Sequence, residues 1–110
     1  MGSRPRPPSQ SRVTLQVRFL AEAYVDIATI YDWYERARTG LGLEFIEAVD
    51  KAVEQIAQFP ESGRIVRGEI RRILTRRFPY GLLYIAGDEE IVALGCFHLR
   101  RDPRVWSSRD

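Results

Sequence analysis

The sequence has few of the side chains that build metal centres and covalent cross-links. Its 110 residues include one cysteine, Cys96, and one histidine, His98. A single cysteine can form no internal disulfide, and it cannot supply the cysteine ligands of a structural zinc site. We therefore expect no metal ion, no cofactor, and a reducing, cytoplasmic setting.

Long apolar runs are missing as well. No stretch of the chain approaches the roughly 18 apolar residues that a membrane-spanning helix requires, so we expect no membrane partner. The first residues, MGSRPRPPSQS, lack the apolar centre of a secretory signal and are rich in proline, serine and arginine. We expect residues 1–12 to form a disordered arm and residues 13–110 to form one folded domain.

Lysine is nearly absent, since 16 of the 17 basic residues are arginine. A coding bias towards arginine would explain this choice, but it would not explain why the arginines cluster. Residues 64–77 contain six arginines and one acidic residue, and residues 98–109 contain four arginines and one acidic residue, whereas residues 20–63 contain nine acidic and three basic residues. Guanidinium groups bind phosphates and carboxylates in a bidentate manner. The two basic segments are therefore candidate surfaces for an anionic partner.

Two amphipathic helices are predicted behind a short strand. Residues 13–19 alternate between apolar and polar side chains, which predicts a half-buried strand at an edge of a sheet. Apolar residues then step by four and three along two stretches, which predicts two helices joined by the link TGLG, with Gly40 ending the first helix. The first stripe is Leu20, Tyr24, Ile27, Tyr31 and Tyr34, and the second is Phe45, Val49, Ala52, Ile56 and Phe59.

Three strands are predicted after the second helix. They span residues 69–78, 80–86 and 90–98, with a tight turn at Gly87-Asp88 between the last two. The last strand is apolar on both faces, which indicates a strand inside the sheet. One of its faces is expected to carry Val92, Leu94, Cys96 and His98. The order of elements, β-α-α-β-β-β, predicts an α+β fold in which a helical hairpin packs on a mainly antiparallel sheet.

Four segments in this order resemble the RelE/ParE superfamily of toxins from type II toxin–antitoxin systems. They are AEAYVDIATIYDWY in the first helix, IAQFPESGRIV at the end of the second, IRRILTRRFPYGLLY across the next two strands, and FHLRRDPRVW near the end. The resemblance covers residues 13–106 and is closest to the ParE-like branch, whose members are often described as plasmid stabilisation proteins. It implies a bacterial, cytoplasmic toxin that forms a hetero-oligomer with a cognate antitoxin.

Members of the RelE branch are similar to ribonucleases that cleave mRNA in the ribosome, and this branch implies a catalytic set. The implied residues are His98 as base or acid, Arg71 and Arg101 as phosphate stabilisers, and Tyr80 or Tyr84 as a proton donor. The lysine-rich helices of that branch are replaced here by acidic helices, which disfavours an RNA substrate. A structural role is the alternative for the histidine, since it ends an apolar strand.

Members of the ParE branch are similar to inhibitors of DNA gyrase that act by binding, without a catalytic site. This interpretation fits the acidic helices better, so the sequence leans towards a protein that is not an enzyme. The antitoxin is expected to lay an amphipathic helix into a groove beside the helical hairpin. The candidate contact residues for antitoxin or target are apolar residues of the hairpin, arginines of the basic segments and a late tryptophan: Trp33, Leu43, Ile46, Arg71, Arg72, Arg76, Arg77, Arg100, Arg101, Arg104 and Trp106.

The sequence therefore favours a growth-arresting toxin that inhibits gyrase and is neutralised by its antitoxin. Two alternatives stay open: a ribosome-dependent endoribonuclease of mRNA, and a non-toxic remnant that binds an antitoxin only for regulation. The two tryptophans also have structural alternatives, Trp33 in the seam between the helices and Trp106 as a lid over the sheet edge.

Overall fold

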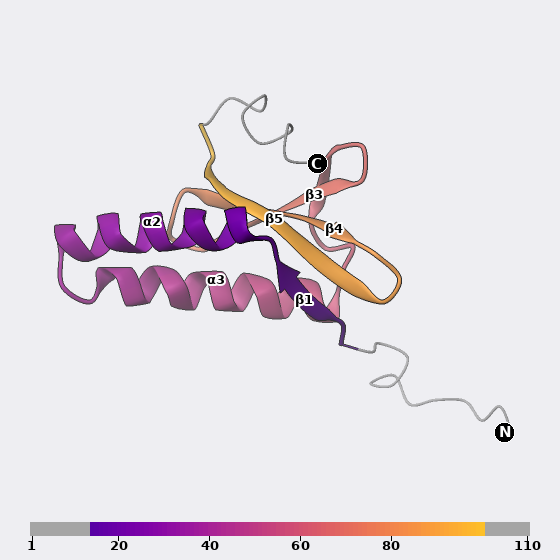
Figure 1. Cartoon of the computed structure of the whole chain (residues 1–110), viewed down its shortest axis with the longest axis horizontal. Coiled ribbons are helices and arrows are strands. Elements are labelled where there is room, and N and C mark those ends of the chain that lie inside the picture. The colour runs from indigo at the N-terminus through magenta and orange to yellow at the C-terminus, as the bar shows by residue number, and fades with distance from the viewer. Residues whose placement is uncertain (1–13, 101–110) are drawn as a thin grey trace, which may run out of the picture.

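A computed structural model describes residues 14–100 of the chain. In chain order the elements are β1 Gln16–Phe19, α2 Ala21–Ala37, α3 Leu41–Gln58, β2 Arg64–Arg67, β3 Ile70–Leu74, β4 Tyr80–Ala86 and β5 Glu90–His98. The two helices run side by side and pack against one face of the sheet (Figure 1). The predicted α+β fold, with a helical hairpin on a mainly antiparallel sheet, is confirmed.

The sheet has five strands in the order β1-β5-β4-β3-β2. Only β1 and β5 run parallel to each other, and the other neighbours are antiparallel. β1 lies at an edge, as its alternating sequence predicts, with Leu15, Val17 and Phe19 packed against the core. β5 has a neighbour on each side, which confirms that it is an internal strand.

The apolar stripe of α2 differs from the prediction at its start. Ala23 and Ile30 are the buried residues of this helix, and Ile27 and Tyr34 pack beside them. Tyr24 is 63% exposed, so its place in the predicted stripe is wrong. Its ring stacks on Phe19 of the edge strand at a centroid distance of 5.2 Å, which holds it beside the core rather than in it.

The stripe of α3 is confirmed over most of its length. Phe45, Val49, Ala52 and Ile56 are all buried, whereas Phe59 follows the helix and is 45% exposed. The predicted link TGLG is shorter in the structure, because α3 already begins at Leu41.

Gly40 and Gly42 have different roles in the link between the helices. Gly40 has a φ of 91°, a left-handed conformation that glycine adopts without strain. Gly42 lies inside α3, where a Cβ would meet the Tyr31 ring at 2.8 Å, so its absence of a side chain allows the two helices to approach closely.

Strand β2 is missing from the sequence prediction. Arg64, Ile65 and Arg67 are all exposed, so the strand lacks the alternation of burial that identifies a strand by its pattern. It forms a hairpin with β3 through Gly68, whose φ is 54°.

The next strand is shorter than the predicted 69–78, since β3 ends at Leu74 and residues 75–79 form a turn to β4. The Thr75 hydroxyl donates to the Phe78 carbonyl at 2.9 Å and fixes this turn. Arg77 adopts a φ of 72° there, a conformation that costs a residue with a side chain about 1–2 kcal/mol. The backbone that carries Arg76 and Arg77 is therefore held in one conformation.

A β-bulge changes the face that the end of β5 presents. The register between β4 and β5 shifts by one residue, and Leu94 is the extra residue. Cys96 therefore shares the helix-facing core with Ala93, and the expected face that joined Cys96 and His98 to Val92 is wrong. The bulge turns His98 towards the side of the sheet on which α2 lies.

Candidate functional site

Tyr84 and Arg71, two residues of the implied ribonuclease set, both bind the turn that follows α3. Tyr84 is fully buried; its hydroxyl donates to the Pro60 carbonyl at 2.8 Å and accepts from the Gly63 N–H at 2.8 Å. Burial raises the pKa of this phenol. Arg71 pairs with Tyr84 across the strands and donates to the carbonyls of Glu61 at 3.1 Å and Gly63 at 2.8 Å. The two side chains thus fasten residues 60–63 to the sheet.

His98 lies with Tyr80 at the opposite end of β4. The two residues are register partners, and their rings meet edge to face at a centroid distance of 5.3 Å. The Arg100 N–H donates to Nδ1 of His98 at 3.1 Å, so a neutral imidazole carries its proton on Nε2. Tyr84 follows Tyr80 by four residues of extended strand, or about 13 Å. Of the described residues in the implied catalytic set, His98 and Tyr80 therefore come together, whereas Arg71 and Tyr84 lie apart from them.

A pocket of about 320 Å³ opens between α2 and the end of β5, and His98 is one of its walls. Trp33 stands at this pocket with 62% of its surface exposed, so it lies outside the seam between the helices. The Cys96 N–H donates to Asp26 Oδ2 at 3.0 Å beside it. Sequence reasoning missed this contact, because the two residues are 70 positions apart and share no motif. Burial, with a smaller effect of the Asp26 charge, raises the pKa of the Cys96 thiol to about 12.

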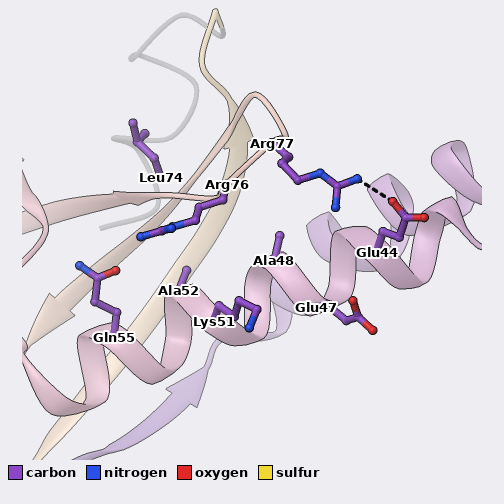
Figure 2. A pocket seen from close by; sticks show the side chains of 9 residues that line it. All are labelled: Glu44, Glu47, Ala48, Lys51, Ala52, Gln55, Leu74, Arg76 and Arg77. Carbon is purple, nitrogen blue, oxygen red and sulfur yellow. Dashed lines mark hydrogen bonds and ion pairs between the residues drawn. The ribbon is translucent and has the colours of Figure 1, made fainter.

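A second groove, of about 380 Å³, lies between α3 and the turn from β3 to β4 (Figure 2). Arg76 and Arg77 reach over it from the turn, and Ala48 and Ala52 of α3 form its floor. Glu44 closes one end, because it binds Arg77 at 2.7 Å.

Glu44 connects α3 to the link between the helices and to the turn from β3 to β4. Its carboxylate also lies 3.6 Å from the Arg38 guanidinium, in the link between the helices. The hydrogen bond from Arg77, assisted by both arginine charges, lowers the pKa of Glu44. The sequence-predicted Arg77 therefore has a partner within its own chain.

The remaining candidates are spread over the surface. Leu43 is 58% exposed near the start of α3, whereas Ile46 is partly buried against the core. The stem of Arg72 covers Gly81, and Arg100 is exposed at the end of the described chain. Arg101, Arg104 and Trp106 lie outside the described residues, as does the arm expected at residues 1–12.

Within residues 14–100, no three histidine, cysteine, aspartate or glutamate residues are grouped so that they could hold a metal ion. None of the helices in this part of the chain is both long and apolar enough to span a membrane. Two of the pockets, both beside the helices, and the exposed arginines are the features at which the predicted contact residues gather.

Comparisons with known proteins give one family and one fold. A family model described as "ParE toxin of type II toxin-antitoxin system, parDE" matches residues 17–103. The fold is similar to a solved chain described as "Chromosomal ParDE TA system from P. aeruginosa", with a TM-score of 0.68, 19% sequence identity, and coverage of 77% of this chain and 96% of that chain. Comparison with curated proteins gives no match. At this identity the structural similarity supports the fold alone, whereas the family match spans most of the sequence. The resemblance of the four motifs is confirmed, and the chain belongs to the ParE toxin family of type II toxin–antitoxin systems.

Proposed function

We propose that this toxin arrests growth by inhibiting DNA gyrase and that a cognate antitoxin neutralises it by binding. The observation that carries the proposal is the use of Tyr84 and Arg71, which bind the backbone of residues 60–63 instead of facing a substrate. Because these two groups are occupied in holding the fold, their arrangement favours inhibition by contact over catalysis by this pair. Membership of the ParE toxin family supports the same conclusion.

Exposed arginines supply the contact surface that such an inhibitor needs. They lie on β2, in the turn from β3 to β4, and after β5: Arg64, Arg67, Arg76, Arg77 and Arg100. Eight of the thirteen acidic residues in the described part of the chain lie on the two helices, which carry only two basic residues, Arg36 and Lys51. Such a distribution steers and orients an anionic partner towards the strand side of the molecule.

A supercoiling assay tests the proposed target directly. Purified toxin is titrated into gyrase with relaxed plasmid and ATP, and the topoisomers are separated by electrophoresis. We expect supercoiling to stop, and we expect it to return when the toxin is first mixed with an equimolar amount of its antitoxin. Unchanged supercoiling at a large excess of toxin would remove gyrase as the target.

The ribonuclease alternative retains one supporting observation, since His98 and Tyr80 both line the open pocket beside α2. It predicts mRNA cleavage on translating ribosomes that is lost in His98→Ala. A His98→Ala toxin that folds, shown by an unchanged circular dichroism spectrum, and remains fully toxic would exclude catalysis by this histidine.

The third candidate, a non-toxic remnant, is separated from the other two in cells. Induced expression without the antitoxin, followed by colony counting, should reduce viability if the chain is an active toxin. A pulse label of DNA and protein synthesis then identifies the process that stops first. Normal colony counts at high expression would favour the remnant.

A further inference from the structure

The groove between α3 and the turn from β3 to β4 has two unlike ends. At one end Glu44 and Arg77 form an ion pair at 2.7 Å. At the other end the Arg76 guanidinium extends towards the side of the groove where Gln55 rises from α3 (Figure 2). Among residues 14–100, Arg76 has no carboxylate partner. The open end therefore places the charged donors of Arg76 beside the side-chain amide of Gln55, whose oxygen lies on the Arg76 side in Figure 2.

Apolar surface lies directly beside these donors. Leu74 is 51% exposed above the groove, and Ala52 is buried in its floor. A ligand that fills this end must therefore combine a carboxylate with an adjoining apolar group. The backbone of the turn that carries Arg76 is already held by the Thr75 hydroxyl, so the ordering required on binding is confined to side chains.

The outer surface of α3 limits the class of partner. Glu47 and Lys51 also line the groove, and Asp50 and Glu54 are exposed further along the helix. The lining is therefore of mixed sign, with Glu44 and Glu47 beside Lys51, Arg76 and Arg77, and it lacks the uniform positive charge that a phosphate backbone requires. These carboxylates repel a polyanion such as DNA or RNA, whose phosphates would lie along the whole groove. A single carboxylate placed over Arg76 avoids them. The charges thus fit a protein segment better than a nucleic acid.

We propose that this groove binds an acidic–apolar segment of the antitoxin, with an aspartate or glutamate of that segment bound by Arg76 and Gln55 and a neighbouring apolar side chain packed on Leu74 and Ala52. The inference rests on the proposed neutralisation by an antitoxin and adds the surface and the chemistry of the contact. In this contact the amide nitrogen of Gln55 donates to the bound carboxylate. A negative charge at position 55 would therefore weaken binding of the segment, and a positive charge would strengthen it.

Charge substitutions at the open end test the assignment. The probes are the full-length antitoxin produced together with this toxin and overlapping 20-residue peptides that span it, with affinity measured by calorimetry and fluorescence anisotropy. Arg76→Gln should weaken binding by about 10- to 100-fold, because it removes a charge-assisted hydrogen bond. Gln55→Glu should weaken binding and Gln55→Lys should strengthen it.

Matched controls lie outside the groove. Arg36→Gln removes an exposed arginine from α2, and Gln58→Glu makes the same substitution one turn further along α3. Both should bind the antitoxin as the unmodified toxin does. The peptide that binds should lose affinity when its acidic residues are replaced by amides, and a lysine at the critical position should restore binding to an Arg76→Glu toxin.

Several outcomes overturn the proposal. Equal affinities for Arg76→Gln, Gln55→Glu and the unmodified toxin place the antitoxin elsewhere and leave neutralisation itself intact. Failure of the unmodified toxin to bind its antitoxin removes both proposals. An Arg76-dependent affinity for a DNA duplex, or self-association that Arg76→Gln abolishes, assigns the groove to nucleic acid or to a second copy instead. Because the readout is antitoxin binding, a negative gyrase assay does not affect this test.

Discussion

The Tyr84 phenol connects the middle of the sheet to the turn that ends α3. Its oxygen lies between the Pro60 carbonyl and the Gly63 N–H, and a Cβ at Gly63 would meet this oxygen at 2.5 Å. Position 63 therefore requires a residue without a side chain. The motif PESG, which the sequence presents as a helix stop, is also the site at which a buried phenol is held.

Tyr84→Phe should lower the free energy of unfolding by about 1–3 kcal/mol, because it leaves the Gly63 N–H and the Pro60 carbonyl without their partner. Urea unfolding followed by circular dichroism measures the change. Tyr24→Phe is the control, since this ring is 63% exposed and its hydroxyl should matter by less than about 0.5 kcal/mol. Equal effects of the two substitutions would contradict the structural role of Tyr84.

Cys96 should be unreactive in the folded protein. Its thiol is 3% exposed, and burial raises its pKa from 9.0 to about 12. At pH 9 about half of the unfolded thiols are thiolate, whereas about one in a thousand is in the folded chain, and the thiolate is the reactive form. Reaction with dithionitrobenzoate should therefore be slow until guanidinium chloride unfolds the protein. Rapid labelling without denaturant would show that β5 is open in the native state.

At the scale of the element, the start of α3 depends on a side chain from α2. Gly40 precedes α3 and has no side chain with which to cap it. The two Glu35 oxygens accept from the N–H groups of Gly40 and Gly42, each at 2.9 Å. A carboxylate at a helix N-terminus satisfies free donors and interacts favourably with the helix dipole. One residue thus caps the second helix and fixes the angle of the hairpin.

Glu35→Ala should destabilise the protein by about 0.5–2 kcal/mol, the range found for loss of a helix cap. Glu35→Gln keeps one acceptor oxygen, so its free energy of unfolding should lie between those of the unmodified protein and of Glu35→Ala. Asp32→Ala is the matched control, because Asp32 is exposed one turn earlier on the same helix. Chemical denaturation of the four proteins gives the comparison, and an effect of Asp32→Ala as large as that of Glu35→Ala would argue against the cap.

The accuracy of sequence-based prediction varied between elements for physical reasons. The stripe of α3 was predictable because Phe45 and Ile56 are large, apolar and fully buried. The start of the α2 stripe was misplaced because the buried residue is the small Ala23, while the larger Tyr24 faces solvent. The bulge at Leu94 could not be seen, because apolar residues on both faces hide a shift of one residue.

The site was less predictable than the fold. The cluster of arginines at residues 64–77 was visible in the sequence, but the turn that carries Arg76 and Arg77 was predicted as strand, and the contact between Glu44 and Arg77 joins residues 33 positions apart. The position of His98 depends on the bulge that precedes it, and the role of Tyr84 depends on Pro60 and Gly63 in another element. Contacts of this kind follow from the assembled sheet and leave no local pattern.

At the scale of the whole molecule, the start of the described part of the chain is bound to the end of α3, because the Leu15 N–H donates to the Ala57 carbonyl at 3.0 Å. Removal of residues 1–12 breaks none of the contacts described among residues 14–100. We expect the melting temperature of the shortened protein to lie within about 2 °C of that of the full chain. A larger shift would mean that residues 1–12 contribute more than several tenths of a kcal/mol to the free energy of unfolding. Scanning calorimetry of both proteins tests the domain boundary, and a clearly lower melting temperature would extend the domain into residues 1–12.

The parallel pairing of β1 with β5 also sets the timing of assembly during synthesis. Among residues 14–100 the first strand pairs with the last, in a register that joins Gln16 to Glu90. At about 5–20 residues per second, translation reaches this partner about 4–15 s after β1 has been made. A chain that stops before β5 lacks Ile91 and Ala93 of the core and leaves β1 without a neighbour. We therefore expect a chain interrupted before β5 to be unable to complete this sheet, so that folding of the domain waits for the synthesis of β5.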